Sequence, residues 1–191
     1  MKTLDALLAD MRACRVCADE LPLGPRPVVQ ISPTARVLIA SQAPGTNAHE
    51  SGVPFSDASG DRLRDWMGLS ADEFHDESKI AIVPMGLCYP GRAPKGGDAP
   101  PRRECAPLWR GQLLAQMPDL RLTLLVGTYA QTHALGSGRM TDRVMGFREH
   151  LPRTFPLPHP SWRVRNWMVR NPWFEIEAIP ALRHAVEDAL A

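Results

Sequence analysis

Four cysteines are the residues whose type and spacing most directly suggest chemistry. Cys14 and Cys17 form a C-x-x-C pair, and Cys88 and Cys105 follow after intervals of 70 and 16 residues. Four thiolates make a complete site for zinc or for an iron–sulfur cluster, and spacing alone does not separate the two. Disulfides are a weaker interpretation for a cytosolic chain, whose thiols stay reduced, and scattered buried thiols are a further alternative.

A second chemically versatile group lies toward the C-terminus. His159 stands between two prolines at the expected end of a strand, where a rigid turn would fix its ring. The segment after it interleaves aromatic residues with cations: Trp162, Arg163, Arg165, Asn166, Trp167 and Arg170. That pattern suits phosphate contact combined with wedging between bases. An ordinary surface helix with two buried tryptophans is the alternative interpretation.

Composition indicates a globular protein of one domain, spanning residues 1–191, with 44% hydrophobic and 23% charged residues. The net charge of +1 excludes a global field for a polyanion. The charges are nevertheless unevenly distributed. Residues 46–77 contain eight acidic residues and two arginines, whereas residues 139–170 contain seven arginines and two acidic residues. This asymmetry hints at nucleic-acid contact, although solvated faces would produce it as well.

Targeting signals are not apparent. No apolar run approaches the roughly 18–20 residues of a membrane helix, and Asp5 and Asp10 interrupt the apolar N-terminus, which argues against a secretory signal. We therefore expect a cytoplasmic monomer without membrane contact.

Apolar patterning predicts elements that could position these residues. Compact apolar runs without alternation predict buried parallel strands, and helical spacing predicts the segments between them. The expected strands cover 36–40, 80–85, 122–127 and 155–157. The expected helices cover 3–13, 60–67 (capped by Ser59), 104–116, 128–135 and part of 173–190. Strands that alternate with helices indicate an α/β fold with a mainly parallel sheet, whose ligand site lies beyond the carboxyl ends of the strands.

Taken in order, these pieces resemble the uracil-DNA glycosylase superfamily, most closely its iron–sulfur branch, family 4, and a group of short bacterial proteins of that superfamily. The resemblance runs from Cys14 to the helix after His159, through SQAPG at 41–45, GVPF at 52–55, Cys88, Cys105 and HPS at 159–161. It implies a three-layer α/β/α sandwich. It also implies a 4Fe–4S cluster of structural role on Cys14, Cys17, Cys88 and Cys105, with zinc as the alternative, and DNA as the partner.

The resemblance also implies a reaction: hydrolysis of the N-glycosidic bond of uracil, or of another deaminated or damaged base, after the base has left the stack. Phe55 would stack on the base and His159 would donate to its carbonyl as negative charge grows on it. Ala43, Asn47 and Tyr89 would complete the pocket. The loop after His159 would contact DNA through Pro160, Ser161, Trp162, Arg163 and Arg165.

Two positions depart from the family-4 pattern. Gln42 stands where that family has a glutamate, so it can orient water or the base edge but cannot act as a base. Pro84 stands where the family has its base-reading asparagine, and proline has no side-chain donor. Asp57, two residues after Phe55 as in the family-5 glycosylases, is the candidate water-activating carboxylate; the alternative is an acid favoured by a helix dipole. Two other functions stay open: a non-catalytic nucleic-acid binder, and a hydrolase of free nucleosides or nucleotides.

Overall fold

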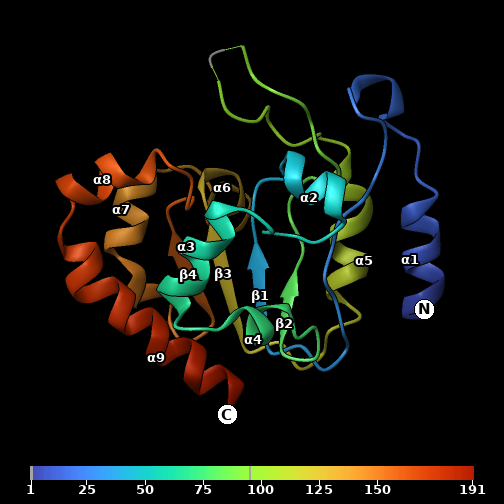
Figure 1. Ribbon diagram of the computed structural model, residues 1–191. Helices are drawn as coiled ribbons and strands as arrows, with labels where there is room; N and C mark the ends of the chain where they lie inside the picture. Colours follow the sequence, from blue (N-terminus) through green and yellow to red (C-terminus); the bar gives the residue numbers. More distant parts are fainter. Residues whose placement is uncertain (1, 95) are drawn as a thin grey trace.

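A four-stranded sheet forms the centre of the computed structural model, which describes residues 2–94 and 96–191. The strands are β1 (Val37–Ala40), β2 (Ile80–Ile82), β3 (Leu122–Val126) and β4 (Thr154–Leu157), in the order β2-β1-β3-β4. Every pairing between these strands is parallel (Figure 1). The expected α/β class and the four strand positions are therefore confirmed, with β2 ending three residues earlier than expected.

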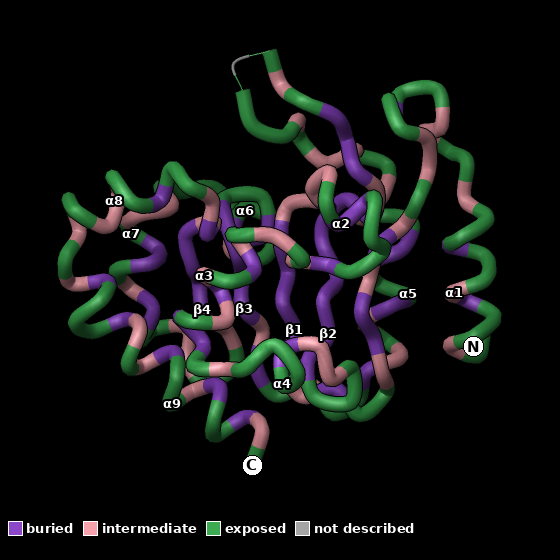
Figure 2. The backbone as a smooth tube through the Cα atoms, in the orientation of Figure 1, coloured by how far each residue is buried: buried purple, intermediate pink, exposed green. Residues whose placement is uncertain are grey.

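Helices cover both faces of the sheet, because successive strand residues point to opposite sides. Val37 and Ile39 pack toward α3 (Ala58–Met67) and α9 (Ile179–Leu190). Leu38 packs toward α1 (Leu4–Arg12) and α5 (Gly111–Leu114), while Ala40 packs toward α6 (Thr128–Leu135). The strands form a buried central layer between them (Figure 2). The expected three-layer α/β/α sandwich is confirmed.

Several boundaries differ from those expected. The predicted Ser59 cap is wrong: Asp57 caps α3, and its Oδ1 accepts from the backbone N–H groups of Ser59 and Gly60, each at 3.1 Å. The segments expected to be single helices at 104–116 and 173–190 each begin with a π-helical stretch, Ala106–Arg110 and Phe174–Ala178. Three short helices had no sequence prediction of their own: α2 (Thr46–Ser51), α4 (Ala71–His75) and α7 (Met140–Met145). The helix expected after His159 is α8 (Val164–Arg170). Two short 3₁₀ helices cover Ala18–Glu20 and Phe147–His150.

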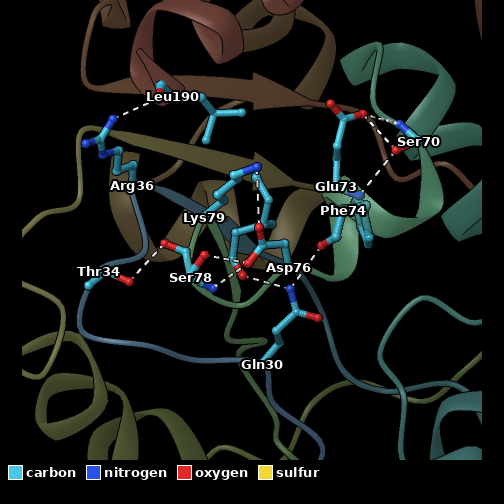
Figure 3. A network of polar contacts seen from close by, with 11 residues as sticks. Gln30, Thr34, Arg36, Ser70, Glu73, Phe74, Asp76, Ser78, Lys79 and Leu190 are labelled. Atoms are coloured by element: carbon cyan, nitrogen blue, oxygen red, sulfur yellow. Dashed lines mark hydrogen bonds and ion pairs between the residues drawn. The ribbon is translucent and has the colours of Figure 1, made fainter.

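A polar network closes the amino edge of the sheet (Figure 3). Gln30 Nε2 donates to the carbonyl oxygens of Phe74, at 2.9 Å, and Ile80, at 2.7 Å, and Arg36 donates to Leu190 O at 2.8 Å. These bonds satisfy backbone carbonyls that would otherwise lie buried and unpaired. Within the described residues, no helix has the length and apolar character needed to cross a membrane.

Candidate functional site

A cleft of about 620 Å³ lies beyond the carboxyl ends of the strands. Its walls come from the turn after β1, from α2, from residues 54–59, from a loop after β2 and from the loop after β4. Most of the residues expected to act on a base line it: Gln42, Ala43, Asn47, Phe55, Asp57, His159, Ser161, Trp162 and Arg163. Segments far apart in the sequence thus meet where ligands bind in open parallel sheets.

The loop after β2 forms a short hairpin beside the cleft, which we call the cleft hairpin (residues 91–94 and 96–99; Figure 1). An isolated antiparallel bridge pairs Arg92 with Asp98. Two side chains from other walls of the cleft hold the hairpin: Gln42 Nε2 donates to Ala99 O at 2.8 Å, and Arg163 Nη2 donates to Gly96 O at 3.0 Å. The amide nitrogen of Gln42 therefore already has a structural partner.

Phe55 has a backbone conformation that few side chains adopt. Its φ is +55°, in the left-handed region that costs a non-glycine residue roughly 1–2 kcal/mol. Its carbonyl oxygen accepts from Arg64 Nη1 at 3.3 Å, and its ring meets Phe74 edge-to-face with centroids 6.1 Å apart. Gly60 allows this conformation, because its bare Cα lies against the Phe55 backbone. These contacts hold the ring in the cleft wall.

Two carboxylates line the cleft. Asp57 uses Oδ1 to cap α3, and no described residue donates to its Oδ2. Asp98 extends from the cleft hairpin, and Oδ2 lies 3.6 Å from where a Cβ on Gly45 would stand. Partial burial raises the pKa of Asp98; the charge of Arg92 opposes that shift, and the smaller effect of the Asp57 charge adds to it. Both carboxylates therefore face the same cleft.

His159 packs against the bare backbone of Gly127 at the end of β3. Gly127 has a φ of +84°, and a Cβ there would lie 3.3 Å from the Cβ of His159. Burial lowers the pKa of His159, and the negative charge of Asp57 only partly offsets that effect. Neither ring nitrogen has a hydrogen-bond partner among the described residues. The arrangement favours a neutral imidazole whose N–H can donate into the cleft.

Three residues expected at the site lie outside the cleft lining. Tyr89 is buried and packs near His49 of α2, with ring centroids 6.2 Å apart. Pro160 is buried and its carbonyl oxygen accepts from Arg62, so it shapes the loop after β4. Arg165 is exposed on α8. By contrast, Trp162 is 71% exposed at the cleft rim, with the Arg163 guanidinium 5.4 Å from its ring centre.

Sequence reasoning missed two charged residues of the cleft, Arg92 and Asp98. A signal for Asp98 was available: it is a carboxylate within the Gly/Pro-rich stretch that follows the second strand. Pro84 also lines the cleft, so the position at which the resemblance expects an asparagine does belong to this wall.

The four cysteines line a second cavity, separate from the cleft. Cys14 and Cys17 follow α1, Cys88 follows β2, and Cys105 precedes the π-helical stretch at 106–110. A backbone N–H group faces one of the sulfurs: Leu87 N donates to Cys105 Sγ at 3.3 Å. Burial is the main cause that raises the pKa of Cys88 to about 12 and of Cys105 to about 11. Ligation by these thiols would have to displace their protons.

Arg102 provides a test of whether an anionic group suits this cavity. Its side chain lines the cavity, and its Nε is buried with no hydrogen-bond partner among the described residues. The nearby charges are Glu20 and Glu104, which pair with Nη2. A buried donor beside four thiols fits a negatively charged sulfur-ligated group. Within the described part of the chain, however, no three His, Cys, Asp or Glu side chains form a group that could hold a single metal ion.

Comparison with known proteins supplies the family. The model of the uracil DNA glycosylase superfamily matches residues 28–183. Among solved structures, the NMR structure of a Methanosarcina acetivorans protein with a provisional uracil DNA glycosylase assignment is similar, with a TM-score of 0.47 and 16% identity. That similarity covers 84% of this chain and 97% of the other. The superfamily match spans β1 to α9 and includes every residue that lines the cleft, so the chain belongs to the uracil DNA glycosylase superfamily.

Proposed function

We propose that this protein is a DNA glycosylase that hydrolyses the N-glycosidic bond of a deaminated or damaged base. The observation that carries the proposal is the meeting of Phe55, Asp57 and His159 in one cleft at the carboxyl edge of the sheet. An aromatic ring, a neutral donor and a carboxylate are the three groups that excision of a flipped base requires.

Binding begins when the base leaves the stack and enters the cleft. Phe55 stacks on the flipped base, and its constrained backbone means that little conformational entropy is lost on binding. Trp162 and Arg163 stand at the rim, where an exposed indole can wedge against neighbouring bases and the guanidinium can meet a phosphate.

Bond cleavage needs a donor for the departing base and a nucleophile for the sugar. The C1′–N bond breaks with its electron pair moving to the base, and the His159 N–H stabilises the negative charge that develops on a carbonyl oxygen. Asp57 Oδ2 orients a water toward C1′ and accepts its proton as the new C–O bond forms. The products are the free base and an abasic site.

We also propose that Cys14, Cys17, Cys88 and Cys105 hold an iron–sulfur cluster. The support is a cavity lined by four cysteines, with the Leu87 N–H on one sulfur and an Arg102 Nε that has no partner among the described residues. Zinc is the alternative occupant, because the same four thiolates would complete a tetrahedral zinc site. The cluster would supply a structural link between the segment after α1 and the two flanks of the cleft hairpin. Iron and sulfide analysis of anaerobically purified protein distinguishes it from zinc.

The test of the glycosylase proposal uses that same protein. It is incubated with single-stranded oligonucleotides that each contain uracil, hypoxanthine or 8-oxoguanine, and abasic sites are detected by alkaline cleavage. We expect strand breaks with at least one base, and a loss of about a hundredfold or more in His159→Ala. His133→Ala is the matched control, because His133 is exposed on α6 and does not line the cleft.

The alternatives predict different results. Salt-dependent DNA binding without release of any base would indicate a non-catalytic binder. Hydrolysis of free deoxynucleosides without DNA binding would indicate a nucleoside hydrolase. Either result would refute the glycosylase proposal.

A further inference from the structure

Base recognition in this cleft needs a group that the expected positions do not supply. Pro84 contributes only an apolar ring at the place where an amide would read the base edge. The Gln42 amide nitrogen donates to Ala99 O, and Asp57 Oδ1 is engaged by the α3 backbone. These side chains therefore have reduced capacity to read a base.

The side chain of Asp98, by contrast, is available to a ligand. Its carboxyl lines the cleft, over the turn at Gly45, and makes neither a hydrogen bond nor an ion pair with any described side chain. Its backbone is held by the bridge to Arg92 and by the Ala99 carbonyl bond to Gln42. A carboxyl that is fixed through its backbone and has no partner among the described residues is prepared to accept hydrogen bonds from a ligand.

We propose that Asp98 is the specificity-determining residue of the cleft and reads the Watson–Crick edge of the flipped base. This inference rests on the glycosylase function proposed above. An ionised carboxylate only accepts hydrogen bonds, so it matches an edge with two adjacent N–H donors. Guanine-type bases present such an edge, a ring N–H beside an exocyclic amino group. In uracil the ring N–H is flanked by two carbonyl oxygens, and one of them would face a carboxylate oxygen.

Protonation changes the edge that Asp98 can match. A carboxylic acid presents one donor and one acceptor, as an asparagine amide does, and that pattern fits the N–H and carbonyl of uracil. Partial burial and the charge of Asp57 make this form more accessible by raising the pKa of Asp98, and Arg92 opposes it. The other titratable or charged groups of the cleft wall are His159, which burial keeps neutral, and Arg163. Preference for uracil should accordingly rise as the pH falls.

The test measures binding, separately from catalysis. Fluorescence anisotropy gives the affinity for oligothymidine strands with one central 2′-fluoro nucleotide that carries guanine or uracil, with the unmodified strand as reference. The fluorine withdraws electrons from the sugar and prevents cleavage. We expect the wild type to favour guanine at pH 8, and Asp98→Asn to shift the ratio toward uracil by about tenfold or more. The ratio in Asp98→Asn should also become independent of pH.

Asp119→Asn is the matched control, because Asp119 is exposed in the turn before β3 and outside the cleft. Equal guanine-to-uracil ratios in wild type and Asp98→Asn would overturn the proposal. Failure of the glycosylase function has a different signature: the guanine-to-uracil affinity ratio changes in Asp98→Asn, but strands without the 2′-fluoro group release no base from the wild type. Base release whose substrate preference ignores Asp98→Asn would refute only the role of Asp98.

Discussion

The close contact between Gly60 and Phe55 predicts a large effect of a single methyl group. A Cβ at position 60 would lie 1.8 Å from the Phe55 carbonyl oxygen, 2.7 Å from its carbonyl carbon and 2.9 Å from its Cβ. The two nearest atoms belong to the backbone, so no side-chain rotation relieves the overlap. Overpacking of this kind costs about 1–3 kcal/mol or more.

Two further contributions set the expected magnitude for Gly60→Ala. Movement of the Gly60 N–H from Asp57 Oδ1, now 3.1 Å away, weakens a helix cap worth about 1 kcal/mol. Alanine returns about 0.5–1 kcal/mol through its better helix propensity. We therefore expect Gly60→Ala to lower the free energy of unfolding by about 1–3.5 kcal/mol.

Urea denaturation measures that loss, with Gly111→Ala as the control. Gly111 is also a helical glycine, with φ −60° and ψ −41°, and it is exposed to solvent. A Cβ at this position would meet nothing within 4 Å. Gly111→Ala should stabilise the protein by about 0.5–1 kcal/mol. A Gly60→Ala variant as stable as the wild type would show that the turn at Phe55 adapts, and the argument for a fixed stacking ring would be wrong.

Three other predictions concern the carboxylate, the cysteines and the histidine. Asp57→Asn keeps the helix cap, so urea unfolding should change by less than about 0.5 kcal/mol while single-turnover base release falls by about a hundredfold or more; unchanged release would exclude Asp57 as the water-activating group. Cys88→Ser should lose bound iron, sulfide and thermal stability together, and a variant that retains the iron content of the wild type would contradict the four-cysteine site. Because the pKa of His159 is lowered on folding, the unfolded state binds a proton more readily, so stability should fall as pH decreases from about 6.5 through the folded-state pKa. Calorimetry should show that His159→Gln lacks this part of the dependence; an identical dependence in both proteins would refute the assignment.

Sequence patterning predicted the sheet because its strands are buried on both faces. An uninterrupted apolar run such as 37–40 is typical of a strand buried on both faces, and the burial of all four residues confirms that interpretation. The helices α2 and α4 have only six and five residues, too few for a helical period to emerge. Their positions depend on local caps, for example the reciprocal bonds between Ser70 and Glu73.

The cleft was predictable where a motif ends a strand, and unpredictable where tertiary contacts orient a loop. Gln42 and His159 each lie two residues after the end of a strand, so both were expected at the carboxyl edge. Asp98 reaches the cleft only because Gln42 and Arg163 hold its hairpin, and no local pattern encodes those bonds. Tyr89 was expected in the pocket, but it packs near His49 on a helix that the sequence had not revealed.

The placement of α9 has a consequence for synthesis of the chain on the ribosome. Leu182, Val186 and Ala189 share one apolar cluster with Val37 and Ile39 of β1, although some 140 residues of chain separate the two elements. Until residues 179–190 emerge from the ribosome, that face of the sheet stays partly uncovered and able to associate with other nascent chains. This face of the core therefore closes only after residues 179–190 have been translated, some 140 residues after β1, and its apolar surface is prone to aggregation during that interval.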